Sequence, residues 1–217
     1  MANNKRKPSR TKVRMEKNIK YQAHWGDSTR AVHAGEDRLR YADSITTPIV
    51  QTSTYAFKDS KEIEAYTKHG KTRFEYGRYG NPTEQVVQRR LAALAGAEDC
   101  LLFGSGMSAI ITAILAFVRS NDHIVITDDA YKKTLEFCNA YLQRFGVDCS
   151  VVPFGDYQAL EKAIRPNTRF IFSESPTNPY LNIFDLDRLY DIAQRHNVMT
   201  MIDATFSTPF NQRPLEF

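Results

Sequence analysis

The sequence predicts an α/β fold in which parallel strands alternate with helices. Short apolar runs of strand length recur from residue 100 onward, and each is followed by a stretch with helical periodicity. Apolar runs separated by helices indicate βαβ units, whose strands are covered on both faces. The composition agrees, because 42% hydrophobic and 25% charged residues are typical of a globular protein.

A basic arm precedes the regular part of the chain. Residues 1–20 contain eight Lys or Arg and one acid, Glu16, a net charge of +7, whereas the whole chain carries +4. We interpret the arm as a solvated, disordered leader, with nucleic-acid binding and a transit peptide as alternatives. It lacks the apolar core of a secretory signal, and no window reaches the ~20 apolar residues that span a bilayer. We therefore expect neither a nucleic acid nor a membrane as partner.

The segment 21–60 is turn-rich, so we expect short helices and little other regular structure there. A polar stretch from Lys58 to Lys71 predicts a short helix. From Asn81 the pattern becomes regular, with Asn81 as N-cap, Pro82 at the first helical position and Gly96 as the stop.

Strand-like runs and helical stretches then alternate along residues 100–203. The expected strands are 100–103, 123–127, 150–153, 169–173 and 198–203, and the expected helices are 108–118, 133–145, 157–164 and 186–196, the last capped by Asp185. The domain organisation predicted from this order is an arm at 1–20, an N-terminal clasp segment at 21–60 and an α/β domain at 61–217.

Two segments of this order are suited to binding a phosphate. The turn Gly104-Ser105-Gly106-Met107 lies before a helix, and the first amides of a helix favour an anion. It is neither a Walker loop nor the dinucleotide fingerprint, so a plain tight turn is an equal alternative. Tyr76 and Arg78 are two residues apart, which in an extended segment turns both side chains the same way. A phenol and a guanidinium together suit a phosphate, with a surface aromatic contact as the alternative.

Three more polar side chains follow predicted strands. Tyr131 comes after 123–127 and Asn178 after 169–173, while Asp203 ends the run 198–203. Ligands of open α/β sheets bind at the carboxyl ends of the strands. We expect 198–203 to be a buried strand that presents the Asp203 carboxylate to a cationic ring nitrogen at this edge.

The three cysteines, Cys100, Cys138 and Cys149, have no metal-ligand spacing and no recognisable catalytic pairing with His. We interpret them as structural, reduced thiols, which favours a cytoplasmic location. No metal site is expected.

Taken together, the motifs resemble those of the Cys/Met-metabolism pyridoxal-phosphate enzymes, the cystathionine γ-synthase-like group of fold-type I. Y-G-R-Y-G-N-P-T, S-G-M, S-P-T-N-P and D-A-T-F-S-T-P occur in the family's order, and the resemblance runs from about His33 to Phe217. It implies pyridoxal 5'-phosphate as cofactor and an incomplete large domain of the aspartate-aminotransferase-like fold, with an N-terminal arm.

The resemblance also implies roles for matching residues. Amides around Gly106 and Met107 would hold the cofactor phosphate, while Tyr76 and Arg78 would reach the phosphate of a neighbouring subunit in a homodimer or homotetramer. Tyr131 would stack on the pyridine ring, Asn178 would lie near its hydroxyl, and Asp203 would pair with its protonated nitrogen. The full cofactor-binding set implied by the family motifs is Tyr76, Arg78, Ser105, Gly106, Met107, Tyr131, Asn178, Asp203 and Thr205.

The chain departs from the family pattern after Asp203. The family's Schiff-base lysine follows by one more loop and strand, and no lysine lies between Asp203 and Phe217. The resemblance thus implies a PLP-dependent C–S lyase or transferase acting on small amino acids, of which this chain is an N-terminal segment without a catalytic residue.

Within the family, the stretch Tyr131-Lys132-Lys133-Thr134 resembles that of plant-type cystathionine γ-synthases, and this resemblance implies γ-replacement on an O-acylhomoserine. Cystathionine lyase, methionine γ-lyase and O-acetylhomoserine sulfhydrylase activities remain open. So does a different class of role, a non-catalytic truncated homologue that acts as a partner subunit. A nicotinamide-binding domain is disfavoured, because the dinucleotide fingerprint is missing.

Overall fold

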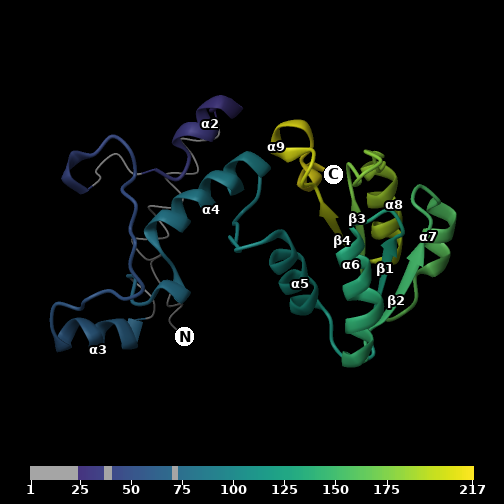
Figure 1. Cartoon of the computed structure of the whole chain (residues 1–217), viewed down its shortest axis with the longest axis horizontal. Coiled ribbons are helices and arrows are strands. Elements are labelled where there is room, and N and C mark those ends of the chain that lie inside the picture. The colour runs from purple at the N-terminus through teal and green to yellow at the C-terminus, as the bar shows by residue number, and fades with distance from the viewer. Residues whose placement is uncertain (1–23, 37–40, 70–72) are drawn as a thin grey trace, which may run out of the picture. The chain divides into compact units, whose positions relative to one another are not determined.

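The computed structural model describes residues 24–36, 41–69 and 73–217 (Figure 1). These form two compact units, divided between Leu102 and Phe103. The predicted arm at 1–20 lies outside the described residues, and the predicted domain boundaries stay predictions. Within the described part of the chain, no helix is both long and apolar enough to cross a membrane.

The first unit consists of helices joined by irregular segments, as the sequence predicts. Its elements are α2 (Asp27–His33), η1 (Tyr41–Asp43), α3 (Ser60–His69), η2 (Gly77–Tyr79) and α4 (Pro82–Ala95). The helix expected between Lys58 and Lys71 is α3, so this prediction is confirmed.

Both ends of α4 form as its sequence predicts. Asn81 Oδ1 accepts a hydrogen bond from the Thr83 amide at 2.8 Å, and Gly96 ends the helix in the left-handed conformation at φ 70°. The Asn81 side chain also donates to the Val50 carbonyl at 2.8 Å, which ties the extended segment before Val50 to the start of α4.

The second unit contains a four-stranded parallel sheet in the order β2-β1-β3-β4. Its strands are β1 (His123–Thr127), β2 (Asp148–Val152), β3 (Thr168–Glu174) and β4 (Met199–Asp203). All four match predicted strands to within two residues at each end. The predicted α/β fold with parallel βαβ units is confirmed.

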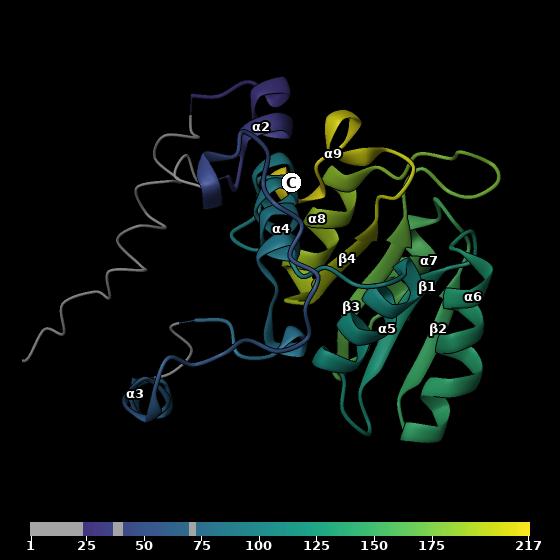
Figure 2. The same cartoon turned by 60° about the vertical axis from the view of Figure 1, so that its left-hand side comes forward.

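Helices cover both faces of this sheet (Figure 2). On one face α5 (Gly106–Phe117) and the helical stretch that begins with α6 (Lys132–Glu136) pack against the sheet, and on the other α7 (Tyr157–Ala163) and α8 (Leu186–His196) do so. Short α9 (Thr208–Asn211) and η5 (Pro214–Glu216) follow β4.

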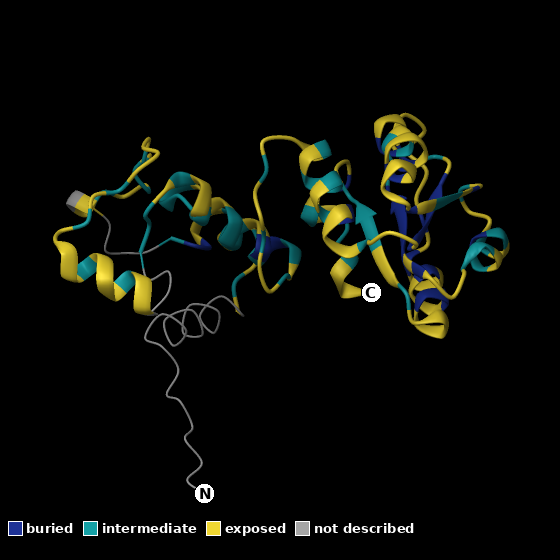
Figure 3. Ribbon diagram, turned by 90° about the horizontal axis from the view of Figure 1, so that it is seen from below, coloured by how far each residue is buried: buried dark blue, intermediate teal, exposed yellow. Residues whose placement is uncertain are grey.

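The middle of strand β1, residues 124–126, is apolar because the strand is buried on both faces. Ile124 and Ile126 pack into the cluster under α5, whereas Val125 points to the cluster under α7 and α8. All five residues of β1 are buried, and Figure 3 shows the buried positions concentrated on the central strands. Burial on both faces excludes the alternation of polar and apolar residues seen in half-exposed strands.

The predicted helix 133–145 is helical but not uniform. It begins as α6, continues as a π-helical turn, η3 (Phe137–Tyr141), and ends as a 3-10 turn, η4 (Leu142–Phe145), before Gly146 at φ 73°. Cys138 and Leu142 are four residues apart and both face the core, where each has no exposed surface. Periodicity in the sequence could not predict the change of helical type.

The prediction of a strand at 100–103 is wrong. This segment has no regular structure, and Leu101 and Leu102 are 73% and 43% exposed. A strand needs a neighbour to satisfy its backbone, and no described strand pairs with the segment.

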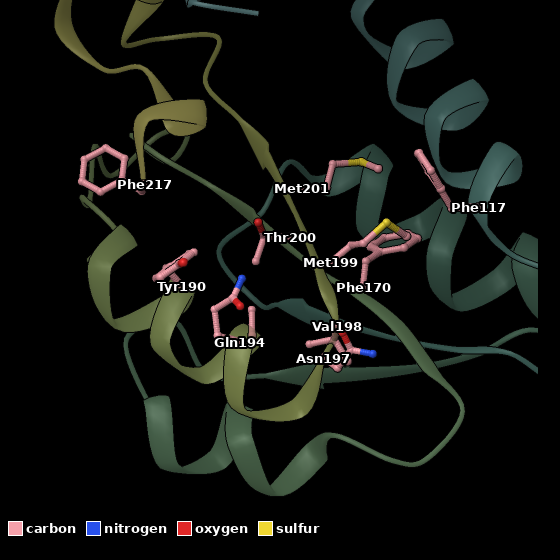
Figure 4. A pocket seen from close by; sticks show the side chains of 11 residues that line it. Phe117, Phe170, Tyr190, Gln194, Asn197, Val198, Met199, Thr200, Met201 and Phe217 are labelled. Carbon is pink, nitrogen blue, oxygen red and sulfur yellow. The ribbon is translucent and has the colours of Figure 1, made fainter. Parts of the chain in front are cut away.

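The expectation that 198–203 is a buried strand is also wrong in part. The strand forms and ends at Asp203, but its residues are exposed or half-buried, because β4 is an edge of the sheet. A cavity of 470 Å³ lies around this edge. Figure 4 shows Phe117 on one side of Met199 and Met201, and Tyr190 and Gln194 on the side of Thr200.

Candidate functional site

The amino end of α5 provides a group of outward-facing amides. Ser105 is the N-cap, and its hydroxyl accepts from the Ser108 amide at 3.1 Å. Gly106 and Met107 begin the helix, and the amides of a first turn have no partner inside it. A Cβ built on Gly106 meets no atom within 4 Å, so there is open space at this turn. The geometry fits an anion held by the start of a twelve-residue helix.

Contacts between α5 and α6 bring this turn toward Tyr131. The Thr134 hydroxyl donates to the Met107 sulfur at 3.7 Å, and the Thr134 amide donates to the Tyr131 carbonyl at 2.8 Å. Tyr131 precedes α6 immediately and is 40% exposed, so its ring is accessible. The structure thus places Met107 and Tyr131 on the same side of the sheet.

Asp203 stands at the carboxyl end of β4 and is half-buried. Its Oδ1 accepts two hydrogen bonds from Thr205, one from the amide at 3.0 Å and one from the hydroxyl at 2.5 Å. Among the described residues no other side chain hydrogen-bonds to this carboxylate. The carboxylate is therefore held in place through Oδ1, and its predicted pairing with a cationic ring nitrogen stays a prediction.

A second carboxylate, which the sequence did not single out, lies beside Asp203. Glu174 ends β3, pairs with Asp203 in the strand register, and is 5% exposed. Its Oε2 accepts from the Tyr131 amide at 2.6 Å. Burial raises the pKa of the Glu174 carboxyl, and the charges of Asp203 and Asp129 add to this, while the hydrogen bonds from backbone amides oppose it.

Asp129 is the other residue missed at this edge. Its Oδ2 accepts from the Thr177 hydroxyl at 2.7 Å and from the Asn182 side-chain amide at 2.8 Å. These bonds join the loop after β1 to the loop after β3. The signal for both missed carboxylates is their position, because each follows an apolar strand at the edge where ligands of parallel sheets bind.

Asn178 lies in the loop after β3 with an exposed side chain. Its backbone amide hydrogen-bonds to the Glu174 carboxylate, so the loop is attached to the end of β3. The Ser175-Pro176 and Asn178-Pro179 peptide bonds are both cis. The structure brings Asn178, Tyr131 and Asp203 to one edge of the sheet.

Tyr76 and Arg78 belong to the first unit. The basis of their prediction needs correction, because residues 77–79 form the 3-10 turn η2 instead of an extended segment. The two side chains nevertheless converge. The Arg78 guanidinium lies 5.1 Å from the centre of the Tyr76 ring and 5.3 Å from that of Tyr79. Tyr76 and Arg78 are both exposed, so the pair is accessible.

The cysteines stay outside this arrangement. All three are free thiols, and Cys138 is fully buried. A hydrogen bond with Cys149, together with burial, raises the pKa of the Cys138 thiol, which disfavours a nucleophilic thiolate. Within the described part of the chain, no group of three or more His, Cys, Asp or Glu side chains could hold a metal ion.

Comparison with known families identifies the family of this chain. Residues 28–217 match the family of Cys/Met metabolism PLP-dependent enzymes. The chain belongs to this family. The predicted family membership is confirmed, and so is pyridoxal 5'-phosphate as the cofactor on which the family depends.

Relatives with different activities match the chain over most of its length. Cystathionine gamma-synthase 1, chloroplastic, of Nicotiana tabacum is 41% identical over 192 residues, covering 87% of this chain and 36% of the relative. L-methionine gamma-lyase of Treponema denticola is 36% identical, covering 88% of this chain and 48% of the relative. The chain thus spans between a third and a half of these curated relatives.

A solved structure supports the fold assignment. A Campylobacter jejuni protein assigned as O-acetylhomoserine (thiol)-lyase, solved with N'-pyridoxyl-lysine-5'-monophosphate, matches with a TM-score of 0.82 at 30% identity. The match covers 89% of this chain and 47% of that one. The prediction of an incomplete fold-type I domain is confirmed.

The residues present fit most parts of the family's cofactor. The open turn at Gly106 suits the phosphate, and the half-buried Asp203 carboxylate, anchored by Thr205, suits the protonated ring nitrogen. Residues 204–217 of this sequence contain no lysine.

Proposed function

We propose that the carboxyl edge of the sheet in the second unit binds pyridoxal 5'-phosphate, and that the residues up to Phe217 hold it by non-covalent contacts. The observation that carries this proposal is the joint position of the α5 turn, Tyr131 and Asp203 around the same strand ends. When bound, the cofactor withdraws electrons from an attached amino acid, and its ring nitrogen must stay protonated for this. Each of the three groups has a distinct part in holding it.

The parts follow from the geometry of the residues. Amides of Gly106 and Met107, with the Ser105 hydroxyl, bind the phosphate at the positive end of α5. The Asp203 carboxylate, oriented by Thr205, holds a proton on the ring nitrogen. Tyr131 covers one face of the ring and excludes water there, and Asn178 orients the ring hydroxyl.

We propose further that the complete enzyme carries out γ-replacement on an O-acylhomoserine, as cystathionine γ-synthases do. The Tyr131-Lys132-Lys133-Thr134 stretch supports this choice, and so does the tobacco relative's name. Cystathionine lyase, methionine γ-lyase and O-acetylhomoserine sulfhydrylase activities are the alternatives. They differ in the amino-acid substrate and in whether cysteine, sulfide or water completes the reaction, so product analysis with an O-acylhomoserine, cystathionine or methionine, with and without cysteine or sulfide, distinguishes them.

A non-catalytic role is the second candidate. It is favoured by the exposed pair of Tyr76 and Arg78. In this role the pair reaches the cofactor phosphate of another subunit, in a homodimer or homotetramer. Sedimentation of the chain alone and mixed with a full-length relative tests it, and absence of any mixed species would contradict it.

The proposed compartment is the cytoplasm, on the basis of the three free thiols. The chloroplastic tobacco relative makes a plastid the alternative, with the basic residues of 1–20 as a transit peptide. Microscopy of the full chain with a C-terminal fluorescent tag distinguishes the two, and loss of residues 1–20 from the purified protein would favour the plastid.

The decisive experiment for cofactor binding is an absorbance titration with pyridoxal phosphate, followed by borohydride reduction and intact-mass measurement. The proposal predicts saturable binding that inorganic phosphate competes for, and no stoichiometric adduct on a lysine. Pyridoxal, which lacks the phosphate, serves as control ligand and should bind more weakly. Equal binding of pyridoxal would contradict the role of the α5 turn.

A further inference from the structure

Two loops carry the residues expected to contact the cofactor ring, and neither belongs to a helix or strand. Tyr131 ends the loop after β1, and Asn178 lies in the loop after β3. Polar contacts cross between these loops in both directions. Asp129, in the first loop, binds Thr177 and Asn182 of the second, whereas Glu174, at the base of the second, binds the Tyr131 amide of the first.

Glu174 has the central position in this arrangement. Its carboxylate accepts hydrogen bonds from the backbone amides of Tyr131 and Asn178, and the Tyr131 bond is 2.6 Å long. Glu174 also lies opposite Asp203 in the register of β3 and β4, and the Ser175 amide donates to the Asp203 carbonyl at 3.0 Å. The Glu174 side chain therefore connects two of the predicted site residues, and the backbone pairing of β3 with β4 places the third, Asp203, beside it.

A buried carboxylate between acidic neighbours is costly, and this cost needs an explanation. Glu174 is 5% exposed and feels the negative charges of Asp203 and Asp129. No lysine or arginine in the described residues forms an ion pair with it. What compensates for its burial is the pair of amide hydrogen bonds, which suggests that holding these amides is its role.

We propose that Glu174 is a positioning residue of the cofactor site, which fixes the Tyr131 and Asn178 loops relative to Asp203. The assignment to the cofactor rests on the proposed function. The residue acts through backbone amides, so it needs no contact with the cofactor itself. Within the described residues no hydrogen bond joins the α5 turn to Glu174 directly, and Thr134 links Met107 to Tyr131 only through a 3.7 Å contact with sulfur, so we expect the phosphate end of the site to be nearly independent of Glu174.

This independence gives a test with two ligands. Replacing Glu174 by Ala removes both amide acceptors, so the two loops lose their fixed positions. Affinity for pyridoxal phosphate should fall about tenfold, whereas affinity for inorganic phosphate should stay unchanged. Glu174→Gln keeps one acceptor oxygen, and its affinity for pyridoxal phosphate should lie between that of the unsubstituted chain and that of Glu174→Ala. Glu136→Gln, an exposed glutamate on α6, is the matched control.

The anchoring itself is measured without any cofactor. In amide hydrogen exchange followed by NMR, Tyr131 and Asn178 should both lose protection in Glu174→Ala, by about tenfold or more. The Thr177 amide bonds to the Asn182 carbonyl at 3.0 Å and should keep its protection. Unchanged exchange at Tyr131 and Asn178 would overturn the proposal, whatever the ligand affinities are.

The ligand results separate the remaining outcomes. An equal fall in affinity for both ligands would show that Glu174 supports the fold in general, and would overturn the positioning role. Unchanged pyridoxal phosphate affinity in both variants would overturn it as well. If the unchanged chain binds inorganic phosphate but no pyridoxal phosphate, the proposed function fails and the cofactor assignment of Glu174 fails with it. The exchange data then still decide whether Glu174 anchors the loops.

Discussion

The two ends of the same parallel strands use polar residues in opposite ways. At the amino ends, polar side chains bond mainly to one another and close a network. At the carboxyl ends, carboxylates bond to backbone amides and to loop side chains, and both hydrogen bonds that described residues donate to the Asp203 carboxylate go to Oδ1, which leaves Oδ2 without one from a described side chain. The polar groups at the amino ends therefore stabilise the fold, whereas those at the carboxyl ends are available to a ligand.

The amino end is centred on His123, the first residue of β1. Its ring nitrogens bond to the Thr168 hydroxyl at 2.8 Å and to the Ser150 hydroxyl at 2.9 Å, and it is fully buried. Arg165 donates to Ser150 and to Asp148, which completes the network. Burial, with the nearby charge of Arg165, lowers the pKa of His123 to about 4, although Asp148 opposes this.

The largest expected effect comes from removing the centre of the amino-end network. His123→Ala leaves a cavity between three strands and removes a hydrogen-bond partner of Thr168 and Ser150, so the free energy of unfolding should fall by about 3 kcal/mol. Urea denaturation measures it. His196→Ala, on the exposed side of α8, is the control and should cost less than about 1 kcal/mol. Similar losses of unfolding free energy in the two variants would contradict the structural role assigned to the buried amino-end network.

The same residue predicts a loss of stability in mild acid. The unfolded chain protonates His123 near pH 6.5, whereas the folded chain does so only near pH 4. Stability from this group is therefore complete above about pH 6.5 and is lost as the pH falls toward 4, by up to about 3 kcal/mol. Denaturation at several pH values should show this slope, and His123→Ala should lack it. An equal slope in the variant would assign the acid sensitivity to other groups.

At the carboxyl end, Asp203→Asn tests the open carboxylate. The substitution keeps the size and one acceptor oxygen but removes the charge that the cofactor's ring nitrogen needs. Pyridoxal phosphate should bind about tenfold more weakly, with the free energy of unfolding nearly unchanged. Asp187→Asn, on the exposed first turn of α8, is the matched control. A large loss of stability in Asp203→Asn would place this residue with the structural group.

The smallest loss of stability is expected from substituting Arg169, on the solvent-exposed side of the amino-end network. Arg169 is half-exposed, and its bond to Asp122 is 3.0 Å long. Asp122 also accepts from the Arg119 amide, so it keeps a partner when Arg169 is removed. Arg169→Ala should therefore cost about 0.5 kcal/mol in denaturation experiments. A cost near that of His123→Ala would mean that the whole network, and not its buried centre, stabilises the sheet.

The sequence predicted the sheet well because the burial of its strands is a local property. In β1 every residue is apolar or satisfied by a neighbouring strand, and the strand was located to the residue. The caps at Asn81 and Asp185 were equally clear, because capping depends on side chains close in sequence. The failures, at 100–103 and in the burial of β4, concern strand neighbours, which no local pattern specifies.

The site was predicted in part for the same reason. Asp203 and Asn178 stand where their strands predict, and the turn at Gly106 begins a helix. Glu174 and Asp129 were missed because their importance lies in contacts across more than 40 residues of sequence. The convergence of Tyr76 and Arg78 was predicted, but for the wrong backbone conformation.

The most direct test of the account is chemical-shift mapping of the ¹⁵N-labelled chain during a pyridoxal phosphate titration. The account predicts shifts at Gly106, Met107, Tyr131, Asn178 and Asp203, all on the carboxyl side of the sheet. The amides of His123, Asp148 and Thr168, at the opposite ends of the strands, should not move. Shifts at the amino ends, or none at the carboxyl ends at saturating cofactor, would contradict the assignment of this edge as the binding site.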